Sequence, residues 1–255
     1  MIPLFTSHYS LYSSLLTLEE NKELNDNEPI SILSIIDKYK LDKLFLVENA
    51  MSSFVDAYKK LGEINCQLIF GLKLVVCNDA ADKSETSLKT ESKVIVWIKN
   101  SEGYKSMLQI YKKAFTDDFY YRGRTDWKTL NQLIDNNLSL SIPAYSSFLH
   151  NNILKGYNCI PDFGNLKPNI LISDLGLPFD NILRQKHINY AKNNDLEINE
   201  CLPIYHYSKK DWDAFCIYRA IQNRGSYSSP KIDNFGSDLA CWENYCKQNK
   251  IKFYE

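Results

Sequence analysis

Short hydrophobic runs alternate along the chain with segments whose hydrophobic residues recur at helical spacing. The runs are rich in β-branched residues and are bounded by polar residues, glycine or proline, a pattern typical of strands. The predicted strands are residues 2–8, 43–47, 67–76, 93–98, 138–142, 169–172 and 202–206. The predicted helices are residues 30–39, 53–62, 103–115, 129–136, 181–193 and 209–223, with a weaker helical pattern at 239–248.

Alternation of strands and helices indicates an α/β protein with a mainly parallel sheet covered by helices, either open or closed into a barrel. Ser208 is expected to cap the helix at 209–223, with Asp211 completing a capping box and Gly225 stopping the helix. The polar stretch at 78–92 is expected to be a surface insertion rather than a linker. We therefore expect a single domain over residues 1–255.

The composition mainly excludes classes of function. The net charge of −1 gives no overall basic field that would attract nucleic acid, but it does not exclude a local basic groove. No segment is apolar and long enough to cross a membrane, and the N-terminus lacks the pattern of a signal peptide. Together with cysteines that occur singly, these features favour a cytoplasmic protein with buried free thiols. The seven cysteines are Cys66, Cys77, Cys159, Cys201, Cys216, Cys241 and Cys246.

Five passages, in order, match motifs of one family. "YSLYSSLLT" resembles a His-Ser-x-Tyr-Ser-Leu-Leu turn, and "SIIDKYKLDKLFLVENAMSSFVDAYKKL" resembles a helix, strand and helix around a Thr-Asp-His-Gly element. "CQLIFGLKLVV" is similar to a Pro-Ile-Ile-Gly-x-Glu strand, and "LPIYHYSKKDWDAFCIYRAIQNRG" to an Asn-Asp-Val-His-Tyr strand followed by a helix. The most specific passage is "IKNSEGYKSMLQIYKKAFTDDFYYRGRTDWKTL". The family is the PHP (polymerase and histidinol phosphatase) domain, in the version that opens the alpha subunit of bacterial DNA polymerase III.

The resemblance implies a distorted (β/α)7 TIM-like barrel of the PHP type, with metal ligands at the carboxyl ends of the strands. Carried over position by position, most ligands are replaced. Ser7 and Tyr9 replace a histidine pair, and Glu48 and Asn49 replace an Asp-His pair. Lys73 replaces a glutamate, Ala144 lies near the position of a Cys or His ligand, and Ile204 replaces an aspartate. His206 is retained.

A multi-metal site needs several anionic or imidazole ligands, and neutral oxygens offset metal dehydration poorly. An ammonium at Lys73 would repel cations directly. We therefore expect no catalytic residues and no bound cofactor, with a cluster of Mn, Zn or Fe on rearranged ligands as the alternative. His8 could be a displaced ligand, although strand alternation turns it away from the face of Ser7 and Tyr9.

Other candidate residues have two interpretations each. Glu48 and Lys73 could form a salt bridge, and His206 could be a ligand or a satisfied pocket histidine. Lys73, Arg122 and Arg124 are possible phosphate contacts, with a structural clamp as the alternative for the arginines. His150 and His187 are predicted to be surface or core polar residues, and Trp127, Trp212 and Trp242 are interface anchors or core residues.

These expectations favour a catalytically inactive PHP-like domain that acts as a structural or protein-docking module in DNA replication. The expected partner is a replication protein, either a polymerase or a proofreading exonuclease, with at most weak direct binding to nucleic acid and none to membranes. The first alternative is a metal-dependent phosphoesterase or 3′ exonuclease with rearranged ligands. A third possibility is a pseudoenzyme that binds a phosphorylated ligand through Lys73 and Arg122.

Overall fold

The computed structural model describes residues 1–20, 29–222 and 237–254. Its strands are β1 (Ile2–Phe5), β2 (Lys43–Glu48), β3 (Gln67–Cys77), β4 (Ser92–Ile98), β5 (Arg124–Asp126), β6 (Leu138–Ile142), β7 (Asn169–Ile172) and β8 (Ile198–Ile204). Its α-helices are α1 (Ile32–Tyr39), α2 (Phe54–Glu63), α3 (Ser101–Phe115), α4 (Trp127–Leu133), α5 (Phe148–Leu154), α6 (Asp180–Asn193), α7 (Trp212–Gln222) and α8 (Trp242–Gln248). Three short 3₁₀ helices are η1 (Met51–Ser53), η2 (Glu85–Thr90) and η3 (Lys209–Asp211).

The strands pair in the order β2-β1-β8-β7-β6-β4-β3, and β3 also pairs with β2, so the hydrogen-bonded ring closes. β5 pairs with β3 outside this ring. Helices follow most of the strands along the chain. The expected α/β class and the distorted seven-stranded barrel are therefore confirmed.

One strand departs from the expected parallel arrangement. β4 runs antiparallel to both of its neighbours, β3 and β6. The β1–β2, β1–β8, β3–β5, β6–β7 and β7–β8 ladders are parallel. Parallel neighbours need a long crossover, usually a helix, but antiparallel neighbours do not. The segment between β3 and β4 contains only the short helix η2, so the chain returns beside β3 in the opposite direction.

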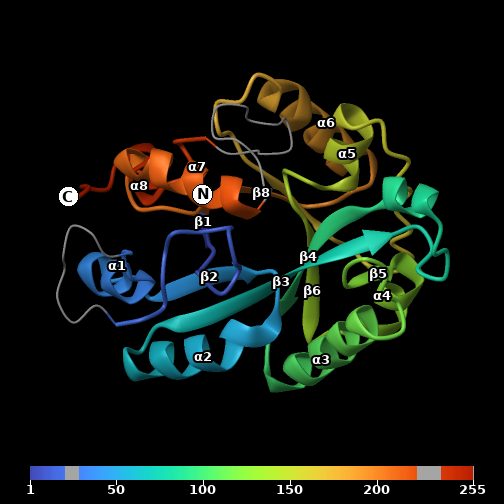
Figure 1. Ribbon diagram of the computed structural model, residues 1–255, viewed down its shortest axis with the longest axis horizontal. Coiled ribbons are helices and arrows are strands. Elements are labelled where there is room, and N and C mark those ends of the chain that lie inside the picture. The colour runs from blue at the N-terminus through green and yellow to red at the C-terminus, as the bar shows by residue number, and fades with distance from the viewer. Residues whose placement is uncertain (21–28, 223–236, 255) are drawn as a thin grey trace. The chain divides into compact units, whose positions relative to one another are not determined.

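The described residues divide into two compact units. The first unit comprises Met1–Phe70, Ser173–Asp180 and Cys201–Glu255, and the second comprises Gly71–Ile172 and Asn181–Glu200. In the second unit α3 packs against α4, β4 and β5 (Figure 1). The expectation of a single domain stays a prediction.

Several local expectations are met. Ser208 and Asp211 form the predicted capping box at η3, while Gly225 lies outside the described residues. All seven cysteines are free thiols, six of them buried and Cys216 half-buried. The segment at 78–92 lies between two strands of the second unit rather than between domains, but it is only partly solvated, because Ser87 and Glu91 are buried. Among the described residues, no helix is both long and apolar enough to cross a membrane.

The ends of two strands differ from the prediction. β1 stops at Phe5 and β8 stops at Ile204, so the polar residues expected at their carboxyl ends lie in the turns that follow. β5 was not predicted, because its three residues are too few to establish a period, and α5 was not predicted either.

Candidate functional site

A buried carboxylate occupies the carboxyl end of β2. Glu48 is 1% exposed, and its Oε1 accepts hydrogen bonds from the backbone N–H of Ser7 at 2.9 Å and from the Ser7 hydroxyl at 2.6 Å. The Ser10 hydroxyl donates to Oε2, and its own oxygen accepts the backbone N–H of Asn49 at 2.9 Å. Both serines are also buried. We call Ser7, Ser10 and Glu48 the serine–carboxylate cluster.

The register of the first two strands explains this cluster. β1 and β2 are parallel, and Phe5 lies opposite Leu46, so Ser7 and Glu48 each follow that pair by two residues. The Thr6 hydroxyl donates to the carbonyl of Val47 at 3.0 Å and continues the pairing beyond the ladder. Carboxyl ends of parallel strands meet at one edge, which is where barrels of this class place their sites.

Tyr9 and Asn49, two further positions where the resemblance places metal ligands, have separate partners. The Tyr9 hydroxyl donates to Asp56 on α2 at 3.3 Å, and Asp56 also forms a salt bridge of 3.0 Å with Lys60. The Asn49 side chain donates to the Ser13 hydroxyl at 3.3 Å. Burial, followed by the nearby Asp56 carboxylate, raises the pKa of Tyr9 and keeps its hydroxyl protonated. Tyr9 therefore ties the turn after β1 to α2.

His206, the retained histidine, is buried in an aromatic environment. Its Nδ1–H donates to the carbonyl of Ser208 at 2.7 Å, and among the described residues its Nε2 has no hydrogen-bond partner. The rings of Phe215 and Trp212 lie 5.4 and 6.1 Å from its own. Burial lowers its pKa, so the imidazole is neutral. Ile204, the other position in this motif, is buried in the ladder opposite Phe5.

His8 is half-buried, and its Nδ1 accepts the backbone N–H of Leu18 at 3.4 Å. Burial lowers its pKa, more than the nearby Glu19 raises it. The imidazole of His8 thus accepts a hydrogen bond within its own turn. That His8 is a displaced metal ligand stays a prediction.

Lys73 and Ala144 belong to the second unit. Lys73 is half-buried on β3 opposite Ile95, and Ala144 is buried just after β6. Because Glu48 belongs to the first unit, the expected pairing of Lys73 with Glu48 stays a prediction.

Arg124 is a structural clamp. It is fully buried, and its guanidinium donates to the Ser87 hydroxyl at 3.0 Å and to the carbonyl of Asp82. It also pairs with Glu91 at 3.4 Å, and Glu91 in turn pairs with the more exposed Arg122 at 3.3 Å. This burial argues against the prediction that Arg124 contacts phosphate, because a buried guanidinium that already donates to these partners is closed to a ligand. Arg122 shares the Glu91 carboxylate and is 57% exposed.

The second unit also contains a serine–histidine pair that the sequence reasoning missed. The Ser147 hydroxyl lies 3.3 Å from Nε2 of His187, and Nδ1–H of His187 donates to the carbonyl of Leu183 at 2.8 Å. A hydroxyl beside an imidazole resembles a nucleophile and its base. Both side chains are buried, however, and Ser147 caps α5. His150 and His187 are thus core residues, as one of the two interpretations expected.

Two of the three candidate tryptophan anchors are core residues. Trp127 is 2% exposed and Trp242 is fully buried, so neither ring is available to a partner, and that interpretation is wrong for both. Trp212 is half-buried at the start of α7.

A metal cluster does not fit the residues at the expected positions. In the first unit these positions supply one carboxylate and one imidazole, and the Glu48 carboxylate already accepts three hydrogen bonds from two serines. Within residues 1–20, 29–222 and 237–254, no three His, Cys, Asp or Glu side chains gather as metal ligands do.

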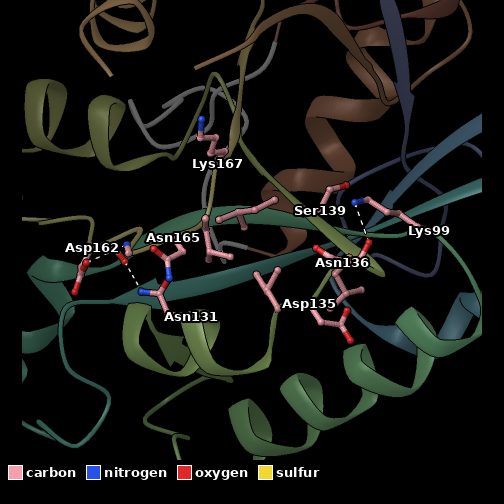
Figure 2. Close-up of a pocket in the computed structure, with 13 residues that line it drawn as sticks. Lys99, Asn131, Asp135, Asn136, Ser139, Asp162, Asn165 and Lys167 are labelled. Carbon is pink, nitrogen blue, oxygen red and sulfur yellow. Dashed lines mark hydrogen bonds between the residues drawn. The ribbon is translucent and has the colours of Figure 1, made fainter. Parts of the chain in front are cut away.

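The second unit contains a pocket of about 680 Å³ at the amino end of β6 (Figure 2). Lys99 Nζ donates to the carbonyl of Asn136 at 3.1 Å, and the Asn131 side chain donates to the carbonyl of Asp162 at 2.9 Å. None of the expected site residues lines it, and Ala144 follows the opposite end of β6. The pocket is therefore separate from the positions that the resemblance assigns to ligands.

Comparison with known proteins identifies the family. No curated protein matches the chain. The family model of the PHP domain matches residues 5–166, which is more than half of the 255 residues. The match includes the last residue of β1, all of β2 and the serine–carboxylate cluster, and the family's fold is phosphoesterase-like. The chain belongs to the PHP domain family.

Proposed function

We propose that this chain is a catalytically inactive PHP domain that acts as a structural or protein-docking module associated with DNA replication. The serine–carboxylate cluster is the observation that carries the proposal. Ser7 and Glu48 are positions where the resemblance puts metal ligands, and Ser7 donates to the buried Glu48 carboxylate. Ser10, in the same turn as Ser7, donates to the other carboxylate oxygen. Hydrogen bonds to a charged acceptor are among the stronger ones, and they supply here the stabilisation that a cation would otherwise give.

Electrostatics supports the absence of catalysis. A metal ion at Glu48 would have to displace two hydroxyl donors from a cluster whose three side chains are at most 2% exposed. The resemblance also places Lys73 where the family has a glutamate, which exchanges a negative charge for a positive one. Each change opposes the binding of divalent cations.

The proposed link to replication rests on the passage at 98–130, which resembles the polymerase version of the domain. The turn in this passage exposes aromatic side chains: Phe115 is 42% exposed, Phe119 48% and Tyr121 71%. Lys83 Nζ donates to the carbonyls of Asp117 and Phe119, at 3.3 and 3.0 Å, and so supports the turn. Exposed aromatic residues are enriched at protein interfaces, and a stable interface needs roughly 800 Å² a side. We propose that this turn contacts a polymerase or a proofreading exonuclease.

The experiment is a native pull-down from the source cells, paired with a hydrolysis assay. The full chain is expected to recover a polymerase or an exonuclease, and Phe119→Ser with Tyr121→Ser is expected to reduce that recovery at least tenfold. Tyr58→Ser is the matched control, because Tyr58 is 65% exposed but lies on α2 in the other unit. Recovery of no replication protein, together with metal-dependent hydrolysis of a phosphomonoester or a DNA 3′ end, would favour the phosphoesterase alternative.

A further inference from the structure

The main chain of Tyr254 is held by side chains rather than by secondary structure. Its N–H donates to the Tyr39 hydroxyl at 3.0 Å. Its carbonyl accepts hydrogen bonds from the Tyr207 hydroxyl and, at 3.1 Å, from Lys38 Nζ. Both polar groups of this residue are thus recognised in the way that a neighbouring strand would recognise them.

The hydroxyls of Tyr39 and Tyr207 form a closed ring of hydrogen bonds with the main-chain N–H and carbonyl of Tyr254. Tyr39 and Tyr207 oxygens are 3.3 Å apart, and either could donate. Because Tyr207 gives its proton to the Tyr254 carbonyl, its oxygen must accept the proton of Tyr39. Tyr39 in turn accepts the Tyr254 N–H, so each hydroxyl donates once and accepts once. Bonds linked in this way polarise and strengthen one another.

Rings and cations complete the site. Phe253 packs on Tyr207 with ring centroids 5.0 Å apart, and Tyr254 meets the edge of Tyr39 at 5.7 Å. Lys38 Nζ lies 5.4 Å from the centroid of Tyr254. Cations over aromatic rings add attraction that depends on an aromatic side chain in the bound segment.

The protein side of the site is fixed by the core. Tyr207 is 7% exposed, and Tyr39 packs edge-on against the fully buried Trp242 at 5.0 Å. Burial also raises the pKa of Tyr207, which keeps its donor proton in place. The bound segment, in contrast, lies in no helix or strand, and Tyr254 is 42% exposed. A preformed site therefore holds a segment that can leave without breaking a sheet.

We propose that Tyr39, Tyr207 and Lys38 form a binding site for an extended peptide with two adjacent aromatic residues after a lysine, and that residues 251–254 occupy it. A partner segment of the same chemistry would exchange with the chain's own Lys252, Phe253 and Tyr254. All residues of the site belong to the first unit. The inference goes beyond the proposed function and does not depend on it, since no residue of the serine–carboxylate cluster takes part.

The chain's own residues 251–254 compete with any free peptide for the site, so they must be weakened before peptide binding is measured. A covalently attached segment competes at an effective concentration in the millimolar range, so a free peptide binds the unmodified chain weakly. Phe253→Ala with Tyr254→Ala in the full chain weakens that competitor and leaves the site intact. The probe is a fluorescent peptide Asn-Lys-Ile-Lys-Phe-Tyr-Glu, and the readout is fluorescence anisotropy, with circular dichroism to verify folding.

The variant is expected to bind the peptide at least tenfold more tightly than the unmodified chain does. Adding Lys38→Ala, a change at an exposed residue, or Tyr207→Phe is expected to reduce binding at least tenfold, and so is replacing Phe-Tyr of the peptide by Ala-Ala. Equal affinity for the variant and the unmodified chain, or binding that ignores Lys38 and Tyr207, would overturn the proposal. If Tyr207→Phe fails to fold, the Lys38→Ala variant and the Ala-Ala peptide still decide the outcome.

Discussion

The Ser7 hydroxyl donates a 2.6 Å hydrogen bond to Oε1 of Glu48, and both side chains are buried. Ser7 lies in the turn after β1 and Glu48 is the last residue of the parallel neighbour β2, so this bond ties the carboxyl ends of the two strands together. Ser10 makes a second link from the same turn. The chain thus supplies, from its own hydroxyl groups, contacts that hold this edge of the first unit.

Replacing Glu48 with glutamine tests the energetic weight of the cluster. The amide oxygen can still accept from Ser7, but the amide nitrogen faces Ser10, whose oxygen already accepts the Asn49 N–H. We expect the free energy of unfolding to fall by about 1–3 kcal/mol, measured by urea denaturation. Glu63→Gln is the control, since Glu63 is exposed on α2. Equal stability of the two variants would contradict a structural role for the carboxylate.

Replacing Arg124 with lysine tests the clamp in the second unit. Lysine keeps the charge but loses the planar fork that reaches Ser87, Glu91 and the carbonyl of Asp82 together. We expect a loss of about 2–4 kcal/mol in the free energy of unfolding, because Glu91 is left buried and incompletely paired.

The control for the clamp is Arg184→Lys, which alters a partly exposed pair with Glu200 and should cost under about 1 kcal/mol. A similar loss in both variants would show that the position of Arg124 is not special.

His187 should make stability depend on pH. Burial lowers its pKa below 6.5, so the unfolded chain binds a proton more readily than the folded chain does. The contribution of neutral His187 to the free energy of unfolding is therefore fully present above pH 6.5. It is lost as the pH falls towards the folded-state pKa, by up to about 1.4 kcal/mol per pH unit. His187→Gln should flatten this slope in urea denaturation between about pH 7 and pH 5. Ser147→Ala keeps the imidazole and should retain the slope; an unchanged slope in His187→Gln would contradict this account.

The sequence predicted elements better than it predicted connections. Strands with a clear hydrophobic run were located well, and the Ser208 capping box was correct. The antiparallel direction of β4 was missed, because a strand's pattern of side chains is the same in either direction. The sequence left Arg124 open between a phosphate contact and a structural clamp, because its burial depends on Ser87 and Glu91, more than thirty positions earlier.

The candidate site shows the same limit. The loss of ligands at Ser7 and Asn49 is a prediction that the resemblance gives position by position. The contacts at these positions could not be predicted, because the hydrogen bonds from Ser7 and Ser10 to Glu48 join residues about forty positions apart. Nor did any short motif mark Tyr39 and Tyr207, which meet the C-terminal segment only after folding.

Lys73→Glu restores the charge that the resemblance expects at one position. We expect no metal-dependent hydrolysis of p-nitrophenyl phosphate by this variant with Mn, Zn or Fe, because Ser7, Tyr9 and Ala144 still provide no imidazole or thiolate. The matched control is Lys99→Glu, the same charge change at an exposed position in the second unit. Hydrolysis by Lys73→Glu that is absent from the control would show that a single residue had silenced the site.

The metal content of the purified full chain tests the central claim most directly. The chain is expressed with Mn, Zn and Fe supplied, freed of loosely bound ions by gel filtration, and analysed by inductively coupled plasma mass spectrometry. With Ser7 and Ser10 bonded to Glu48, we predict well under one metal ion per chain and no change in thermal stability on adding a chelator. Two or more ions per chain at full occupancy, lost together with stability on chelation, would contradict the account.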